Sequence, residues 1–327
     1  LPAELDPATA VKIVPRDGYE QPVALADLPR LGEKMVAPVR HVVELGGKAW
    51  RSYALLACID LVGGRSQRFM DWLVLPELVH TGSLIVDDVQ DRSEVRRKGR
   101  PAHTLWGTAL AINAGTAAYF WGQHVIERSD LSPVDKVRVY EIFFHTMRAA
   151  HAGQALDIAG HHDLLDRVER TGDSDALERR VRQTHLLKSA VPAANLARIG
   201  AVLGGGSPAQ ERALGTYFEA LGVAFQIMDD VLNLDGFEPG LKDTGEDLRE
   251  AKLTFPVAKA LGRLSAHDRA KLAALLRQPA RDEAEVAQAI GMVRESGALR
   301  ASRDEAEVMV QWAWNELNPH LANTDAK

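Results

Sequence analysis

Residues 80–107 read HTGSLIVDDVQDRSEVRRKGRPAHTLWG, which combines an apolar run, three carboxylates and a basic tail. The apolar run at 84–86 leads directly into Asp87, Asp88 and Asp91. In a helix, Asp87 and Asp91 lie at i and i+4 on one face. Two carboxylates this near to each other repel, and burying them costs free energy unless a cation compensates their charge. All-oxygen ligands favour a hard divalent ion such as Mg²⁺.

A second stretch repeats this pattern. The apolar turn at 225–228 (FQIM) precedes Asp229 and Asp230, and the polar residue Asn233 follows at i+4 from Asp229. Two such helices facing each other would form an acidic mouth, filled with Mg²⁺, above an apolar interior. One motif of this kind alone also fits a solvated helix end, whereas the repeat favours a metal site.

Composition excludes several classes of protein. The chain has 327 residues, of which 46% are hydrophobic and 26% charged, as in ordinary globular proteins. A net charge of −6 argues against general nucleic-acid binding. The single cysteine, Cys58, excludes an intramolecular disulfide and fits a reducing compartment, so we expect a cytoplasmic protein. There is no run of 18 apolar residues and no visible signal peptide, so we expect no membrane span.

The distribution of apolar residues predicts an all-α chain. Residues 1–24 are rich in proline and are expected to form an N-terminal arm with little regular structure. From there on, apolar residues recur with helical period, so residues 25–327 are expected to form one domain, a bundle of roughly a dozen helices. Expected features are a helix break at Gly46-Gly47, helices over about 68–91 and 107–128, helix starts at Ser132-Pro133 and Ser207-Pro208, an end near residue 234, and short amphipathic helices from about residue 265.

Basic residues near these motifs suggest an anionic ligand. Lys48 and Arg51 follow the glycine break and would share a helix face near its N-terminus, which is a reasonable diphosphate grip. Arg96 and Arg97 could hold phosphate oxygens bidentately. Each group alone also fits exposed surface charge.

Histidines offer a different interpretation, which the sequence does not favour. His80 and His103 flank the first acidic motif without zinc-ligand spacing. Residues 161–163 (HHD) suggest a metallohydrolase of the HD type, but the further ligands such an enzyme needs are not placed recognisably.

Taken in order, seven pieces of the chain resemble the trans-isoprenyl diphosphate synthases, and among them the geranylgeranyl type. The pieces are GGKAWR, HTGSLIVDDVQDRSEVRRKGRPAHTLWG, INAGTAAYF, GQALDI, LLKS, FQIMDDVLNL and EDLREAKLTFP, within about residues 46–256. The resemblance implies the isoprenoid synthase fold, a helical bundle around a deep central cavity, usually in a homodimer. It also implies condensation of an allylic prenyl diphosphate with isopentenyl diphosphate.

The resemblance also implies a role for each site residue. Asp87, Asp91 and Asp229 would bind three Mg²⁺ ions, with Asp88 and Asp230 in support. The remaining residues would hold the two diphosphates, and the lysines at 188, 242 and 252 would also neutralise the leaving group. For the allylic substrate these residues are Arg96, Lys188, Gln226 and Lys242, and for isopentenyl diphosphate they are Lys48, Arg51, His80 and Arg97. Lys252 would close over the metal-bound diphosphate, and Ser189 would also bind substrate.

Four departures from the family pattern stand out. Asn233 replaces a third aspartate, Ser52 replaces a proline, and Ala251 replaces the glycine before the last lysine. The segment at 158–187 is longer than in the family, which puts the rim of the active site in doubt.

The length of the product depends on what blocks the cavity. One turn below Asp87 lie Gly82 and Ser83, which are too small to stop the chain at fifteen carbons. Tyr119 and Phe120 on the next helix could block it one or two turns below the metals, which fits a limit of about twenty carbons and geranylgeranyl diphosphate as product. Both aromatics also fit an ordinary core or a dimer interface.

Two other functions are compatible with this fold. A terpene cyclase would ionise a prenyl diphosphate and close it into rings, but it needs no second diphosphate site of the kind that the four basic residues at 48, 51, 80 and 97 suggest. A non-catalytic subunit of a prenyl synthase would not need the nearly complete acidic and basic set.

Overall fold

The computed structural model describes residues 1–13, 27–236, 244–277, 282–321 and 327. Within these ranges the regular elements are helices and there is no strand, which confirms the all-α class. The chain divides into two compact units, Leu1–Tyr140 and Glu141–Asp325. The single domain expected for residues 25–327 stays a prediction, and each unit is described by itself.

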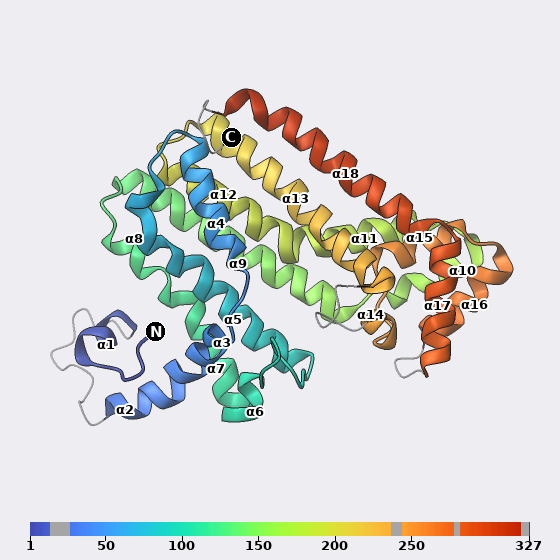
Figure 1. Cartoon of the computed structure of the whole chain (residues 1–327), viewed down its shortest axis with the longest axis horizontal. Coiled ribbons are helices and arrows are strands. Elements are labelled where there is room, and N and C mark those ends of the chain that lie inside the picture. Colours follow the sequence, from blue (N-terminus) through green and yellow to red (C-terminus); the bar gives the residue numbers. More distant parts are fainter. Residues whose placement is uncertain (14–26, 237–243, 278–281, 322–326) are drawn as a thin grey trace. The chain divides into compact units, whose positions relative to one another are not determined.

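In the described part of the first unit, ten helices precede the long α9 (Pro133–Ala159), which crosses the boundary (Figure 1). They are α1 (Pro7–Ile13), α2 (Leu28–Leu31), η2 (Gly32–Val36), α3 (Ala37–Glu44), α4 (Trp50–Leu61), η3 (Ser66–Leu73), α5 (Val74–Gln90), α6 (Ala102–Trp106), α7 (Thr108–Trp121) and α8 (His124–Arg128).

The core of this unit is a close crossing of α5 and α7. Small residues make the crossing possible: a Cβ atom on Gly82 would lie 2.4 Å from the carbonyl oxygen of Gly115. Around it, Leu78 and Ile85 of α5 are buried in one apolar cluster with the alanines of α7. The acidic motif at the end of α5 is therefore carried by a helix that is fixed along its length.

In the second unit, α13 packs along α12 and α18. The helices are η4 (His162–Leu164), α10 (Leu165–Thr171), α11 (Asp175–His185), η5 (Leu186–Ala190), α12 (Val191–Leu203), α13 (Pro208–Asp235), α14 (Glu246–Arg249), α15 (Phe255–Arg263), α16 (Ala266–Leu276), α17 (Glu283–Glu295), α18 (Ala298–Leu317) and η6 (Asn318–His320).

Local capping signals were predicted correctly. The Ser207 hydroxyl accepts a hydrogen bond from the Gln210 backbone N–H at 3.3 Å, and the Ser207 N–H donates to Gln210 Oε1 at 2.9 Å, which completes a capping box. At the start of α9, the Asp135 N–H donates to the Ser132 hydroxyl at 3.2 Å. The break at Gly46-Gly47 also lies where it was expected, between α3 and α4.

The prediction of an arm with little regular structure was wrong for residues 7–13, which form α1. Asp6 stabilises this helix, because its carboxylate accepts hydrogen bonds from the N–H and the hydroxyl of Thr9 at 2.9 and 2.8 Å. Leu5 and Ala10 are buried in the core of the first unit, which holds the helix in place. Residues 14–24 of the predicted arm lie outside the described residues.

Other helix limits differ in detail from the predictions. The helix expected over 68–91 begins as the 3₁₀ helix η3 before α5, and the one expected over 107–128 is divided into α7 and α8 at Gly122. Gly122 lies against α5, because a Cβ atom there would be 2.9 Å from Leu75 Cα. In the C-terminal third, α18 has 20 residues and is longer than the short helices expected.

The long segment at 158–187 contributes to the core of the second unit. Its helices η4, α10 and α11 bury Leu165, Val168, Leu177 and Val181 in the main apolar cluster. The extra length therefore builds packed helices.

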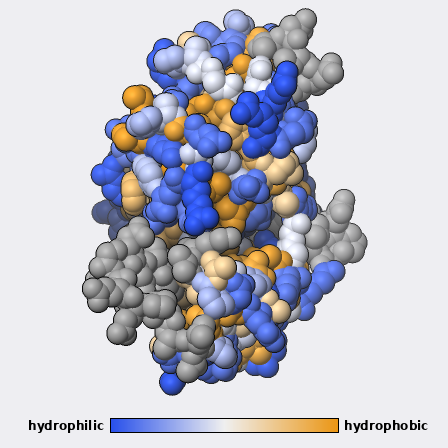
Figure 2. Space-filling view, turned by 90° about the vertical axis from the view of Figure 1, so that its left-hand side faces the viewer, coloured by the Kyte–Doolittle hydropathy of each residue, from blue (hydrophilic) through white to orange (hydrophobic). Residues whose placement is uncertain are grey.

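On the face drawn in Figure 2, hydrophobic residues reach the surface among hydrophilic ones. Two described helical segments, 66–90 and 175–203, are long and apolar enough to cross a membrane by length and composition alone. This is weak evidence, since core helices of soluble proteins pass the same test and 39% and 56% of the two apolar windows are buried. The absence of a membrane span stays a prediction.

Candidate active site

The first acidic motif lies at the C-terminal end of α5. Asp87 and Asp91 are one turn apart, as predicted, and Asp91 caps the helix. Asp88 is 0% exposed and belongs to the interior of the unit. Its Oδ1 accepts a hydrogen bond from Arg96 Nε at 2.8 Å, whereas its Oδ2 has no hydrogen-bond partner among the described residues. The three carboxylates thus have different surroundings.

Arg96 is engaged by this motif. Its Nη2 also lies 3.8 Å from Asp87 Oδ2. Burial alone would lower the pKa of Arg96, but the hydrogen bond that Arg96 donates to Asp88 and the charges of Asp88, Asp87 and Asp91 outweigh it and raise that pKa. Arg96 is therefore held as a cation beside the acidic motif, and its contact with the allylic diphosphate stays a prediction.

A tight turn follows Arg96. Arg96 and Gly99 exchange two backbone hydrogen bonds of 2.9 Å, and the central residues Arg97 and Lys98 have φ of 51° and 65°. Positive φ at both central positions is typical of a type I′ turn, which usually takes asparagine or glycine. The strained turn directs Arg97 toward the glycine break, because a Cβ atom on Gly47 would lie 2.9 Å from Arg97 Cζ.

A basic pocket forms where this turn meets α4 and α5. Burial lowers the pKa of Arg51 to about 10, with Glu77 opposing and Arg97 adding to the shift. Burial lowers the pKa of His80 to about 3, and the charges of Arg51, Arg97 and Arg96 add to this. Arg51 and Arg97 are therefore both near His80, and that the three residues bind one substrate stays a prediction.

Lys48 lies outside this helix. The left-handed residue Ala49, with φ of 45°, separates it from α4, which begins at Trp50. The prediction that Lys48 and Arg51 share a helix face was therefore wrong, although exposed Lys48 is in the loop beside the pocket. Ser52 donates a hydrogen bond to Glu77 Oε1 at 2.5 Å, so the departure at Ser52 helps to hold Glu77 beside Arg51.

The second acidic motif lies near the end of α13. Asp230 Oδ2 accepts a hydrogen bond from the Phe255 N–H at 2.9 Å and lies 3.4 Å from His185 Nε2. Asp230 therefore links α13 to the start of α15 and the end of α11. Asp229 is close enough to His185 to influence its pKa. Gln226 lies one turn earlier on the same helix.

Asn233 has a structural role here. It is 2% exposed, its Oδ1 accepts a hydrogen bond from the Asp247 N–H at 3.3 Å, and its carbonyl accepts one from the Gly245 N–H at 2.7 Å. It thereby holds the start of α14. The side-chain oxygen supports the loop that leads to Lys252, but a carboxylate oxygen would accept the same hydrogen bond, so nothing in the structure explains the departure from aspartate.

Lys188 lies in the π-helical turn η5, next to Ser189. Its Nζ is 2.6 Å from Asp157 Oδ2 on α9. Gly153 permits the close approach, because a Cβ atom there would be 2.2 Å from the Lys188 backbone nitrogen. The pieces GQALDI and LLKS, far apart in the sequence, therefore meet.

Lys252 follows a helix end of the Schellman type. The Ala251 N–H donates to Leu248 O at 3.0 Å and the Lys252 N–H donates to Asp247 O at 2.8 Å. Ala251 takes the left-handed conformation, with φ of 57°, where glycine is usual. Burial lowers the pKa of Lys252, but its 2.6 Å contact with Glu250 and nearby carboxylates outweigh this and raise it. Lys242 lies outside the described residues.

The four predicted chain-length residues have different surroundings. Gly82 lies against Tyr119, which is 7% exposed. Ser83 is exposed, and its hydroxyl donates to His80 O at 2.8 Å. Phe120 is 52% exposed. Only Tyr119 therefore has the position expected of a residue beneath the first acidic motif.

Comparison with known proteins places these features in one family. The Polyprenyl synthetase family profile matches residues 33–293. The chain belongs to this family. It is 34% identical over 297 residues to the short chain isoprenyl diphosphate synthase of Methanothermobacter thermautotrophicus, covering 90% of this chain and 87% of the other.

Two geranylgeranyl-type proteins are also similar. The geranylgeranyl diphosphate synthase of Methanosarcina mazei is 35% identical over 230 residues, which are 70% of this chain and 68% of the other. The crystal structure of the geranylgeranyl pyrophosphate synthetase from Pyrococcus horikoshii superposes with a TM-score of 0.79 at 27% identity, over 90% of this chain and 86% of the other. The isoprenoid synthase fold and the trans-prenyltransferase class predicted from the motifs are thus confirmed.

The carboxylates of the two acidic motifs in this polyprenyl synthetase are ligands of a kind that suits Mg²⁺. In the described part of the chain, no group of three or more histidine, cysteine, aspartate or glutamate side chains is arranged to hold a metal by itself. Mg²⁺ usually uses one or two carboxylates and completes its shell with phosphates and water. Asp87 with Asp91 in one unit and Asp229 in the other supply such carboxylates. That the two motifs face each other stays a prediction.

Sequence analysis missed two residues of the second unit, Asp157 and His185. Asp157 is part of GQALDI, a piece to which no role was given. His185 precedes Lys188 by three residues, which is one helical turn and was the available signal. The structure also gives no support to a metal site at residues 161–163, where His162 Nε2 contacts Leu276 O at 3.0 Å and Asp163 pairs with Arg180.

Proposed function

We propose that this polyprenyl synthetase holds isopentenyl diphosphate in the basic pocket of Arg51, His80 and Arg97, with Lys48 at its edge. The observation that carries the proposal is that the Arg97 guanidinium lies against Gly47, next to Lys48 and four residues before Arg51, and that Arg51 and Arg97 are both close enough to His80 to influence its pKa. Arginine forms paired hydrogen bonds with phosphate oxygens. His80 is neutral near pH 7, because its pKa is about 3, so it contributes a hydrogen bond and no positive charge.

In this proposal, Asp87, Asp91 and Asp229 are the carboxylates that serve the allylic prenyl diphosphate. These residues would hold Mg²⁺, three ions by analogy with the family, and the bound metal would offset the negative charge of the diphosphate. Lys188, Lys252 and Lys242 add positive charge to the same group, and Gln226 and Ser189 orient it. The allylic cation must be shielded from water, which an apolar cavity between the helices achieves. No side-chain nucleophile is required.

Geranylgeranyl diphosphate is the product that we propose. Two similar proteins carry that name, and the small, exposed Ser83 leaves room for growth past fifteen carbons. Tyr119, beneath α5, is then the first bulky side chain on the path. Phe120, half of whose surface is exposed, is assigned instead to the dimer interface proposed below.

The test is substitution in the basic pocket. Arg51→Ala and Arg97→Ala should each raise the KM for isopentenyl diphosphate at least tenfold, which corresponds to a loss of about 1.4 kcal/mol in binding free energy. The KM for the allylic substrate should rise less than threefold. Labelled isopentenyl diphosphate, an allylic diphosphate and Mg²⁺ are incubated with the enzyme and the products are identified. A cyclic hydrocarbon formed without consumption of isopentenyl diphosphate would instead establish a terpene cyclase.

We further propose a cytoplasmic homodimer. The single buried cysteine supports the cytoplasmic location. The family supports the dimer, as do Ile112 and Phe120, which are eight residues apart on α7 and both exposed. Light scattering coupled to gel filtration tests the dimer, and Phe120→Glu should weaken it if α7 lies in the interface. A wild-type monomer at micromolar concentration would contradict the proposal.

A further inference from the structure

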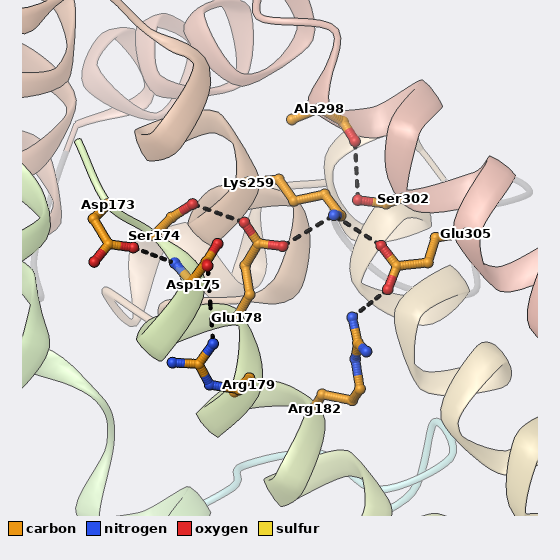
Figure 3. Close-up of polar contacts among 10 residues, drawn as sticks. All are labelled: Asp173, Ser174, Asp175, Glu178, Arg179, Arg182, Lys259, Ala298, Ser302 and Glu305. Carbon is orange, nitrogen blue, oxygen red and sulfur yellow. Dashed lines mark hydrogen bonds and ion pairs between the residues drawn. The ribbon is translucent and has the colours of Figure 1, made fainter.

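Four charged side chains form a network that joins three helices of the second unit (Figure 3). Lys259 of α15 lies 3.0 Å from Glu178 Oε2 on α11 and 2.8 Å from Glu305 Oε2 on α18. Glu305 also pairs with Arg182 of α11, and the Ser174 hydroxyl donates to Glu178 Oε1 at 2.7 Å. The network holds two cations and two anions, and its centre is shielded, since the Lys259 side chain is 14% exposed.

Phe255 connects this network to the acidic motif. Its ring is completely buried and makes two cation–π contacts. Arg182 Cζ lies 5.4 Å and Lys259 Nζ lies 4.9 Å from the ring centroid. Cations that are drawn to an aromatic face hold the ring in one orientation. The backbone N–H of the same residue donates to Asp230 Oδ2 at 2.9 Å.

These contacts close a circuit. Asp230 contacts His185, and His185 lies one turn after Arg182 on α11. Arg182 contacts the Phe255 ring, and Phe255 binds Asp230 again.

Three of the residues predicted to act on the allylic diphosphate adjoin this circuit. Asp229 precedes Asp230, Lys188 follows His185 by one turn, and Lys252 precedes Phe255 by three residues.

We propose that Lys259 and Arg182 are positioning residues, which act through Phe255 to set Asp229, Lys188 and Lys252 at the spacing needed for the Mg²⁺–diphosphate group. The inference rests on the proposed function of those three residues. Lys259 is the centre of the network because it separates two carboxylates that otherwise repel each other in a shielded site. Its loss would leave two anions with one cation and allow α11 and α15 to move apart.

The experiment measures binding of Mg²⁺ with inorganic diphosphate by isothermal titration calorimetry, together with KM for each substrate. Lys259→Met should weaken this binding and raise the allylic KM at least fivefold, with the KM for isopentenyl diphosphate changed less than twofold. Lys259→Arg should stay within twofold of the wild type. The matched control is Lys271→Met on α16, whose side chain is 51% exposed and only loosely paired with Asp268 at 3.9 Å.

A charge-balanced double variant distinguishes a positioning role of Lys259 from a role in folding alone. Lys259→Met with Glu178→Gln leaves the Arg182–Glu305 pair intact and should recover most of the binding lost in Lys259→Met. Phe255→Leu, which keeps an apolar side chain but removes the ring, should weaken binding at least fivefold even if Lys259→Met does not fold.

Two results distinguish the failure of this inference from that of the proposed site. Folded Lys259→Met and Phe255→Leu variants that bind Mg²⁺–diphosphate like the wild type would overturn the positioning role. In the same assay Asp229→Asn should lose binding. If Asp229→Asn binds normally, the metal assignment is wrong, and with it the reason for the positioning role.

Discussion

The ring of Tyr119 lies directly against the bare Cα of Gly82: a Cβ atom there would be 3.1 Å from Tyr119 Cδ1 and Cε1. The same Cβ atom would lie 2.4 Å from the carbonyl oxygen of Gly115. Since backbone atoms cannot give way as a flexible side chain can, α5 and α7 must separate to admit any side chain at residue 82. Sequence analysis treats Gly82 as a position where bulk would shorten the product, but the packing makes it a position of stability.

Ser83→Phe should therefore be the better test of chain length. Ser83 is exposed and lies one turn before Asp87, so a large side chain fits there without moving α7. We expect the main product to shorten toward farnesyl diphosphate, as measured by mass spectrometry after dephosphorylation. Gly82→Ala should instead destabilise the protein by about 1–3 kcal/mol. An unchanged product from a folded Ser83→Phe enzyme would remove α5 from the chain-length path.

Tyr119→Ala should lengthen the product beyond twenty carbons, whereas Phe120→Ala alone should not. The reason is that Tyr119 is buried against α5 and Phe120 faces outward. Mass spectrometry of the products decides this, and the double variant should behave like Tyr119→Ala. If Phe120→Ala lengthens the product and Tyr119→Ala leaves it unchanged, the assignment must be reversed.

Ala251→Gly should stabilise the protein by about 0.5–1 kcal/mol, because a left-handed alanine is strained and glycine is not. The residue occupies the position of the Schellman motif where φ is 57°. Chemical denaturation measures the effect. Ala258→Gly is the matched control: it lies inside α15 and should lose about 1 kcal/mol or more. Equal losses in both variants would show that the turn carries no strain.

His80 should make stability fall on acidification. Its pKa is lowered to about 3 in the folded protein, chiefly by burial, from 6.5 in an unperturbed histidine. As pH falls below the unfolded value, the unfolded chain binds the proton first, so the free energy of unfolding decreases until the folded pKa is reached. Between about pH 7.5 and pH 5 this loss is at most about 2 kcal/mol. His80→Gln should lack this part of the pH dependence in chemical denaturation.

Asp87→Asn, Asp91→Asn and Asp229→Asn should each lower turnover at least about a hundredfold, a loss of about 3 kcal/mol in transition-state stabilisation. An amide keeps the shape of the side chain but removes the charge that would bind Mg²⁺. Steady-state kinetics at saturating Mg²⁺ measure this. Asp304→Asn, in an exposed pair with Arg300, is the control and should be unchanged. Near-normal turnover of Asp87→Asn would contradict the metal assignment.

The sequence by itself determined the features whose causes lie within one helical turn. The cap at Ser207 is one example, since donor and acceptor are three residues apart. The one-turn spacing of Asp87 and Asp91 is another, because it follows from the geometry of a helix. The family motifs were recognisable for a similar reason, as each is a short contiguous piece of the chain.

Only the tertiary structure decided which of these pieces meet. Arg97 lies against Gly47, fifty residues away in the sequence. Lys188 pairs with Asp157, and a side chain on Gly153 would clash with the Lys188 backbone and prevent this approach. Asn233 supports the loop before Lys252 because α14 begins beside it. The physical reason is that such contacts depend on how helices remote in the chain pack against one another, and that packing is set by the fit of whole faces, which no single spacing in the sequence specifies.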